Sequence, residues 1–248
     1  MDATDEDRIR TLTLDRPSVK NAMTPEVALD LAGAVESAGP DDVDAIVLTG
    51  AGDAFCAGGD INAMADREWP PAERARRIEE SFGRLAEAML EADVPIVGRV
   101  NGDAVGAGLA LVALCDFAYA SAGARFNAGF ARVGLIPDTG GTFLLPALVG
   151  LRAAKRLTLA ADFVDAAEAA ELGLVNEAVP PDDLDDRVEA CLALLDTIPT
   201  ETLGRVRQAL HENLGRPYPE ALRTEARLQA EAYATDAHRE GVRAFLER

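Results

Sequence analysis

The sequence has few of the residues that nucleophilic and metal-dependent enzymes use. Among 248 residues there are two histidines and three cysteines. The histidines, His211 and His238, stand late in the chain, and the cysteines are too widely separated to match zinc-ligand spacing. The chain also has no Gly-x-Ser-x-Gly sequence. We therefore expect neither a metal site nor a serine hydrolase triad, which leaves carboxylates for proton transfer.

Long apolar stretches and targeting segments are also missing. No apolar run reaches the length that spans a bilayer. Residues 1–8 are acidic, whereas a secretory signal starts with basic residues before an apolar stretch. The odd number of scattered cysteines is typical of a reducing compartment. The sequence predicts a cytoplasmic protein without a membrane partner.

Basic residues are outnumbered by acidic ones. The chain has 43 Asp and Glu against 24 Lys and Arg, a net charge of −19, and its only lysines are Lys20 and Lys155. Such a surface repels phosphate backbones, so we expect no nucleic acid partner. Because the carboxylates are spread over the whole chain, the composition indicates adaptation to a cytoplasm with molar salt, where screening weakens their repulsion.

Hydrophobic spacing predicts strands and helices up to residue 180 and helices alone after it. We divide the chain accordingly into a core over residues 1–180 and a helical region over residues 181–248. Residues 62–71 show no clear period and are expected to form a surface loop. The other expected elements are strands over 9–14, 44–49 and 94–100, helices that begin at Pro25 with Thr24 as N-cap and that span 74–91, a capping box at Asp165 and Glu168, and three helices within 184–233.

Two glycine-rich turns each follow a strand-like run and lead into a helix-like segment. The first is Ala57-Gly58-Gly59 and the second is Gly106-Ala107-Gly108. The first amides of a helix have no partner within it and lie at the positive end of its dipole, so each turn is a candidate anion site. Neither turn has the full spacing of a dinucleotide-binding motif. One such turn is more often structural than catalytic, but two together predict an oxyanion hole.

Short motifs that include both turns follow one another along the chain. They are Leu12-Thr13-Leu14-Asp15-Arg16-Pro17, Lys20-Asn21-Ala22, Leu48-Thr49-Gly50-Ala51-Gly52, Phe55-Cys56-Ala57-Gly58-Gly59-Asp60-Ile61, Asn101-Gly102 through Gly108, Cys115-Asp116 and Gly134-Leu135-Ile136-Pro137-Asp138-Thr139-Gly140-Gly141. In this order they resemble the crotonase family, the enoyl-CoA hydratase/isomerase superfamily, over nearly the whole chain. The resemblance implies an α/β fold, a crotonase-like spiral of repeated ββα units, with C-terminal helices that join subunits into trimers or hexamers. It also implies an acyl-CoA thioester substrate and no other cofactor.

The resemblance further implies roles for individual residues. The amides of Gly59 and Ala107 would hold the thioester oxygen. The residues expected along the substrate are Lys20, Ala22, Ala57, Asp60, Ile61, Ala110 and Phe130. Positions that resemble coenzyme A contacts are Arg16, Lys20 and Arg67, with Phe245 and Arg248 at the positions that reach a neighbouring subunit's adenine.

The two glutamates with which hydratases of this family move protons are absent. Their positions, matched by spacing from Gly106 and Phe126, are occupied by Ala110 and Phe130. Hydration needs a base for water and an acid for carbon, and neither side chain supplies one. Asp138 stands where typical hydratases have glycine and where isomerases similar to 1,2-epoxyphenylacetyl-CoA isomerase, and aryl-CoA dehalogenases, carry a functional aspartate. An aspartate at this point is also a common turn or N-cap residue.

We therefore predict an enoyl-CoA isomerase in which Asp138 moves a proton along the acyl chain while the two turns hold an enolate. Phe130, Leu135 and Ile136 are the expected apolar neighbours that raise the pKa of the Asp138 carboxyl. Two alternatives stay open. One is a hydratase or hydrolase of the same family that uses another residue. The other is an inactive protein that only binds CoA esters, which the two missing glutamates favour.

Overall fold

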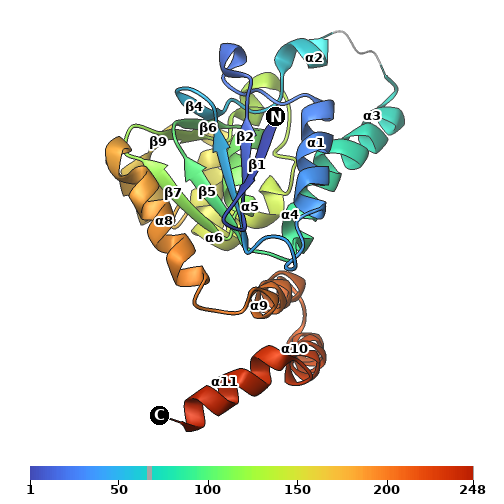
Figure 1. Cartoon of the computed structure of the whole chain (residues 1–248). Helices are drawn as coiled ribbons and strands as arrows, with labels where there is room; N and C mark the ends of the chain where they lie inside the picture. The colour runs from blue at the N-terminus through green and yellow to red at the C-terminus, as the bar shows by residue number, and fades with distance from the viewer. Residues whose placement is uncertain (66–68, 248) are drawn as a thin grey trace.

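The computed structural model describes residues 1–65 and 69–247 and contains repeated units of two strands followed by helices (Figure 1). The strands are β1 (Asp2–Glu6), β2 (Ile9–Leu14), β3 (Ala45–Gly50), β4 (Ala54–Cys56), β5 (Ile96–Val100), β6 (Asp103–Val105), β7 (Phe117–Ser121), β8 (Arg125–Asn127), β9 (Val164–Asp165) and β10 (Glu177–Val179). The α-helices are α1 (Pro25–Glu36), α2 (Ile61–Ala65), α3 (Pro71–Ile78), α4 (Arg84–Glu91), α5 (Ala107–Leu114), α6 (Gly141–Lys155), α7 (Ala166–Glu171), α8 (Leu184–Leu195), α9 (Thr200–Asn213), α10 (Tyr218–Tyr233) and α11 (Asp236–Leu246). The predicted series of ββα units is confirmed.

In the pairs β3–β4, β5–β6 and β7–β8, the first strand joins one sheet and the second strand joins another. The six-stranded sheet has the order β1-β2-β3-β5-β7-β10 and is parallel except for β1. The four-stranded sheet has the order β4-β6-β8-β9 and is parallel except for β9. Because β4, β6 and β8 are parallel neighbours, the turns that follow them lie side by side at one edge of the smaller sheet.

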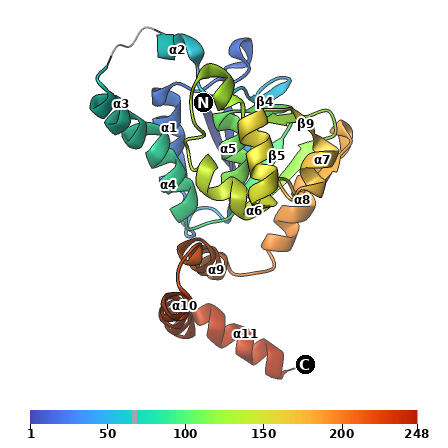
Figure 2. The ribbon, with the colours of Figure 1, turned by 180° about the vertical axis from the view of Figure 1, so that it is seen from behind.

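Helices cover both faces of the larger sheet (Figures 1 and 2). Every residue of α5 is buried, and this helix forms the main core together with α1, α4 and α6. A helix that is apolar all round needs such a position, because it has no polar face to turn to water. On the opposite face α8 buries the apolar positions that its sequence spacing predicts, Leu184, Val188, Cys191 and Leu195.

Most of the local predictions are confirmed. The strand over 9–14 is present, Thr24 caps α1 by accepting a hydrogen bond from the amide of Val27 at 3.4 Å, and residues 71–91 are helical throughout, with a π-helical segment at Glu79–Gly83 between α3 and α4. Asp165 accepts the amide of Glu168 at 2.8 Å, as a capping box requires. The Glu168 carboxylate does not return the bond but pairs with Arg156.

The predicted loop over 62–71 is wrong in part. Residues 61–65 form the short helix α2, and α3 begins at Pro71. The cause is Asp60, whose carboxylate accepts the amides of Asn62 at 3.0 Å and Ala63 at 3.4 Å and so starts a helical turn.

The helices α9, α10 and α11 extend away from the sheets toward the C-terminus (Figure 1). Arg207 on α9 attaches this region to the core, since its guanidinium pairs with Asp116 at 2.7 Å and donates to the carbonyl of Ala92 at 2.7 Å, just beyond α4. Thr224 and Leu228 are the buried residues of α10, and α11 has none among its described residues. No helix in the described part of the chain is both long and apolar enough to cross a membrane.

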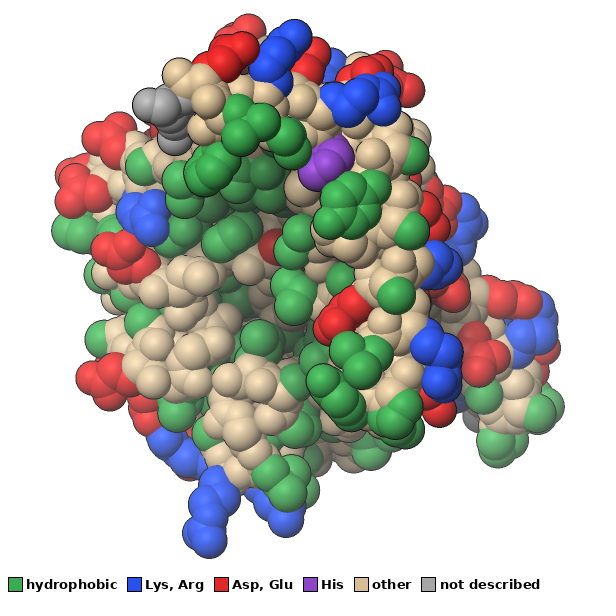
Figure 3. Space-filling model, turned by 90° about the horizontal axis from the view of Figure 1, so that it is seen from below, with side chains coloured by type: hydrophobic (Ala, Val, Ile, Leu, Met, Phe, Trp, Pro, Cys, Tyr) green, Lys and Arg blue, Asp and Glu red, His purple; other side chains and the backbone are tan. Residues whose placement is uncertain are grey.

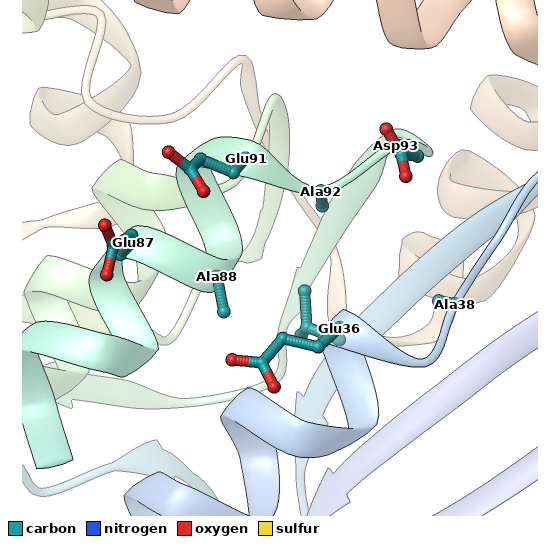
Figure 4. Close-up of a pocket in the computed structure, with 8 residues that line it drawn as sticks. Glu36, Ala38, Glu87, Ala88, Glu91, Ala92 and Asp93 are labelled. Carbon is teal, nitrogen blue, oxygen red and sulfur yellow. The ribbon is translucent and has the colours of Figure 1, made fainter. Parts of the chain in front are cut away.

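Carboxylates crowd a cavity of about 230 Å³ between α1 and α4. Figure 4 shows Glu87 and Glu91 on one side and Glu36 on the other. Glu36 is paired with Arg84 at 2.6 Å. Glu87 and Glu91 are one helical turn apart on α4, a spacing at which like charges destabilise a helix.

We predict that stability rises with salt. Screening weakens the repulsion among 43 acidic side chains, so the melting temperature should be higher in molar KCl than in dilute buffer. For a chain of this size, 1 kcal/mol corresponds to about 2–4 °C. A KCl series followed by circular dichroism measures the effect.

The double variant Glu87→Gln/Glu91→Gln is the matched control for this prediction. It should melt higher than the wild type in dilute buffer and respond less to KCl, because two like charges have been removed. An unchanged melting temperature between dilute buffer and molar KCl would contradict the high-salt interpretation.

Candidate active site

The two predicted turns follow adjacent parallel strands. The segment Ala57-Gly58-Gly59 follows β4, and Gly106 with Ala107 follows β6, which pairs with β4. β8, on the other side of β6, leads to Ala128 and Gly129. The topology of the smaller sheet therefore brings three chain segments, separated by dozens of residues in sequence, to one edge.

The first turn is fixed by Met23. The amide of Met23 donates to the carbonyl of Gly58 at 2.7 Å, and the carbonyl of Met23 accepts the amide of Asp60 at 2.8 Å. In a trans peptide the C=O and N–H groups point in opposite directions, so the amide of Gly59 points away from Met23. Among the described residues, none accepts a hydrogen bond from this amide.

The second turn leaves a matching donor at the start of α5. Gly106 is the N-cap; its own amide donates to the carbonyl of Asn127 at 2.8 Å, and its carbonyl accepts the amide of Ala110 at 3.2 Å. The amide of Ala107 therefore points out of the beginning of the helix, where no intrahelical acceptor exists. It adds the positive end of the α5 dipole to the site.

Glycine is required where the two turns meet. Gly58 has a φ of +91°, and a Cβ atom there would lie 2.6 Å from the carbonyl oxygen of Val105 and 3.3 Å from the amide nitrogen of Ala107. A Cβ at Gly108 would lie 2.2 Å from the carbonyl oxygen of Cys56. No side chain fits between backbones this close, so the two amide donors are held as one unit.

Apolar groups surround the turns at the positions of the absent glutamates. Ala110 is buried on α5. Phe130, on the 3-10 helix Gly129–Val133, is partly buried, and its ring carbons lie 3.9 Å from the position of a Cβ on Gly106. The sequence prediction that neither position supplies a proton-transfer group therefore fits the surroundings. Cys56 is a buried small side chain as expected, and burial raises the pKa of its thiol to about 12.

Asp138 lies in the segment between the 3-10 helix and α6. Burial raises the pKa of its carboxyl, and a hydrogen bond from the Thr139 hydroxyl to Oδ1 at 3.0 Å partly offsets this effect. Of its expected apolar neighbours, Leu135 is 47% and Ile136 is 76% exposed, so neither is a buried side chain, and their contact with Asp138 stays a prediction. The carbonyl of Asp138 accepts the amide of Gly141 at 2.9 Å, just before α6 begins.

The other candidate substrate residues take different positions. Ala22 is buried, Ala57 is partly buried with its amide donating to the carbonyl of Lys20, and Ile61 is 65% exposed at the start of α2. Lys20 is exposed with a left-handed φ of 51°. Asp60 is buried and paired with Arg16 at 2.9 Å. This pairing occupies the guanidinium that the sequence had suggested for coenzyme A.

The predicted tail contacts lie far along the chain. Phe245 is 76% exposed on α11. Arg67 and Arg248 lie outside the described residues. Among residues 1–65 and 69–247, no three His, Cys, Asp or Glu side chains are grouped as metal ligands.

Two residues to which the sequence assigned no role hold the first turn and the segment that leads into β4. One is Met23, which acts through its backbone and has no sequence signal. The other is Asn21, a buried side chain whose Nδ2 donates to the carbonyls of Ala51 at 2.9 Å and Ala54 at 2.8 Å. Its signal was present in the motif Lys20-Asn21-Ala22, but the amide side chain was not assigned a role.

The crotonase fold is defined by two sheets built from ββα units, by two turns that open helices at one edge, and by a helical C-terminal region. The chain belongs to the enoyl-CoA hydratase/isomerase family, whose model matches residues 4–248. Among solved structures, it is similar to the enoyl-CoA hydratase of Mycobacterium smegmatis, with a TM-score of 0.91, 32% identity and coverage of 99% of this chain and 95% of that one.

Curated relatives of the chain carry names of both reactions. A probable enoyl-CoA hydratase of Rhodobacter capsulatus is 40% identical over 240 residues, which cover 97% of this chain and 92% of the relative. The 1,2-epoxyphenylacetyl-CoA isomerase of Escherichia coli is 34% identical over 243 residues, with coverage of 97% and 93%. The predicted family is thus confirmed, and the choice between reactions depends on the residues of the site.

We predict that Ala107→Pro removes one oxyanion donor without unfolding α5. Ala107 is the first residue of that helix, a position where proline is tolerated because its amide has no intrahelical role. Loss of one such donor costs about 3 kcal/mol of transition-state stabilisation, so kcat should fall about a hundredfold or more. Steady-state kinetics on an enoyl-CoA substrate measure the loss.

Ala107→Gly keeps the amide and serves as the control; its activity should stay close to that of the wild type. Both variants must show wild-type helix content by circular dichroism. Full activity in a folded Ala107→Pro protein would remove the second turn from the site.

Proposed function

We propose that this protein is an enoyl-CoA isomerase that moves a double bond from the 3,4 to the 2,3 position of an acyl-CoA thioester. The observation that carries the proposal is the set of proton-transfer groups: Ala110 and Phe130 supply none, whereas Asp138 has a carboxyl whose pKa is raised by burial. Moving a double bond needs one group that takes and returns a proton. Adding water needs two.

The amides of Gly59 and Ala107, which point out of the two turns, support this reaction as the oxyanion donors. The thioester oxygen accepts both hydrogen bonds, and Asp138 removes a proton from C2 of the acyl chain. The electrons of that C–H bond form an enolate whose charge rests on the oxygen between the two donors. Asp138 then delivers the proton to C4, and the double bond is left between C2 and C3. The carboxylate is regenerated, so no other cofactor is needed.

The raised pKa of Asp138 suits both halves of this cycle. A carboxylate with the ordinary pKa is a weak base, and burial makes the Asp138 carboxylate a stronger one. The amides of Gly59 and Ala107 stabilise the enolate in either protonation state of Asp138. The base form of Asp138 is lost as the pH falls through the raised pKa. Activity should therefore disappear at a higher pH than the ordinary aspartate value of about 3.9 would give.

A hydratase is the second candidate because the relative from Rhodobacter capsulatus, at 40% identity, carries that name. A hydratase would need a second proton-transfer group near Ala110 or Phe130. A protein that only binds CoA esters is the third alternative.

We predict that Asp138→Asn lowers kcat for isomerisation of a 3-enoyl-CoA at least about a hundredfold, because asparagine keeps the shape of the side chain and removes the base. The wild-type rate should fall at low pH as Asp138 is protonated, and the residual rate of the variant should not show this fall. Coupled spectrophotometry of 2-enoyl-CoA formation measures both.

Crotonyl-CoA hydration should be slow in the wild type and in Asp138→Asn. Rapid hydration by the wild type would favour the hydratase, and normal isomerisation by the variant would remove Asp138 from the mechanism. Absence of all turnover with tight CoA-ester binding would favour the inactive alternative.

We also propose that the C-terminal helices join copies of this chain into a trimer or hexamer in the cytoplasm, as the family resemblance implies. Apolar side chains are exposed along them: Val206, Leu210, Leu222, Tyr233, Val242, Phe245 and Leu246. An apolar groove of about 400 Å³ lies between α6 and α9. In Figure 3 hydrophobic side chains gather around a hollow on the face seen from below. The three cysteines are free, in keeping with a reducing compartment.

We predict that the double variant Phe245→Ser/Leu246→Ser shifts the assembly toward the monomer. Each of these side chains contributes about 1.5–3 kcal/mol when fully buried, so their loss should be visible at micromolar concentration. Sedimentation velocity should give a multiple of 26.2 kDa for the wild type. Glu240→Ser on the same helix is the control and should leave the mass unchanged, whereas a monomeric wild type would contradict the proposal.

A further inference from the structure

An ion pair connects the segment after β2 with the residue that follows Gly59. Arg16 Nη2 lies 2.9 Å from Asp60 Oδ2, across 44 residues of sequence. The Asp60 side chain is 8% exposed and that of Arg16 is 32% exposed, so the pair is largely shielded from water. Arg16 is the first cause of the lowered pKa of the Asp60 carboxyl, which therefore stays charged at neutral pH.

Both partners of this pair make further hydrogen bonds within the chain. Asp60 Oδ1 accepts the amides of Asn62 and Ala63, while Oδ2 accepts the guanidinium. The other arm of Arg16 donates to the carbonyl of Ala22. Each Asp60 oxygen therefore already accepts a hydrogen bond from within the chain, and Arg16 connects Ala22 with Asp60.

Gly59 lies between the anchored positions. The residue before it is held through the Gly58 carbonyl and the residue after it through the Asp60 amide, and both bonds go to Met23, next to Ala22. Arg16 bridges the same two segments through side-chain bonds. Gly59 has no side chain of its own that could be held. The direction of its amide is thus determined by the bonds on either side.

We infer that Arg16 and Asp60 are positioning residues for the Gly59 amide, holding it at the distance from Ala107 that lets both donors reach one thioester oxygen. This inference rests on the proposed oxyanion hole and adds to it, since Asp60 was expected along the substrate and Arg16 at coenzyme A. The pair touches neither the reacting carbons nor the oxygen. Its effect is transmitted through one peptide unit, from Asp60 to Gly59.

The test is the carbonyl stretching frequency of a bound, unreactive acyl-CoA. Two hydrogen bonds polarise a thioester C=O and lower its stretching frequency. This frequency depends on the geometry of the two donors, so it distinguishes a change in that geometry from a loss of folded protein or of binding affinity. Butyryl-CoA labelled with ¹³C at the carbonyl, bound to the full chain, gives the value by infrared difference spectroscopy. Asp60→Asn and Arg16→Gln should each show a smaller lowering than the wild type.

Kinetics with a 3-enoyl-CoA add a second readout. Because donor geometry acts on the transition state more than on substrate binding, kcat should fall about tenfold or more while KM changes by less than about threefold. The double variant should be no worse than the poorer single variant, since the two residues act as one unit. Arg16→Lys keeps a cation beside Asp60 and loses the Ala22 bond, so it should recover part of the lowering. If Asp60→Asn does not fold, the comparison of Arg16→Gln with Arg16→Lys still tests the positioning role.

Arg8→Gln is the matched control. Arg8 forms an equally short pair with Asp44, at 2.8 Å, and donates to the carbonyls of Pro40 and Asp41. Its loss should leave the carbonyl frequency and kcat unchanged. Equal frequencies in the wild type, Asp60→Asn and Arg16→Gln, or an equal loss in Arg8→Gln, would overturn the positioning role alone. A wild-type frequency that is not lowered on binding would overturn the oxyanion hole itself, whereas failure of the Asp138 assignment would leave this frequency unaffected.

Discussion

The close contact between the backbones that follow β4 and β6 is the constraint on which the site depends. At Gly58 and Gly108 a single Cβ would collide with the neighbouring turn. Parallel pairing of the two short strands sets this approach, and burial of α5 on every side keeps the second turn in place. The donors at Gly59 and Ala107 are backbone amides, which cannot rotate into another position as side chains do. A preorganised pair of this kind stabilises charge without reorganisation during the reaction.

The electrostatics of the chain act at two scales. Over the surface, a net charge of −19 produces long-range repulsion that salt screens. Locally, burial raises the pKa of the Asp138 carboxyl, and the partly buried Arg16–Asp60 pair lowers the pKa of the Asp60 carboxyl. These effects are local and are screened much less by salt. The pKa of the Asp138 carboxyl is therefore set by burial even though the chain as a whole is strongly acidic.

The C-terminal region is connected to the same framework. Arg207 on α9 pairs with Asp116, which comes shortly after α5 ends, and His211 on the same helix lies 2.9 Å from the carbonyl of Leu90. α9 is thus fixed to the core by polar bonds, while apolar side chains such as Leu222 on α10 and Phe245 on α11 are exposed.

The sequence by itself determined the order of the elements, the glycine turns and the family, because hydrophobic period, turn residues and motif order are local properties. It also showed that Ala110 and Phe130 supply no proton-transfer group. The tertiary structure decided what depends on distant partners. Arg16 pairs with Asp60 instead of standing free, α2 forms because Asp60 caps it, and Leu135 and Ile136 are exposed while Asp138 is partly buried. None of these could be read from the sequence, since each depends on segments that only the pairing of β4, β6 and β8 brings together.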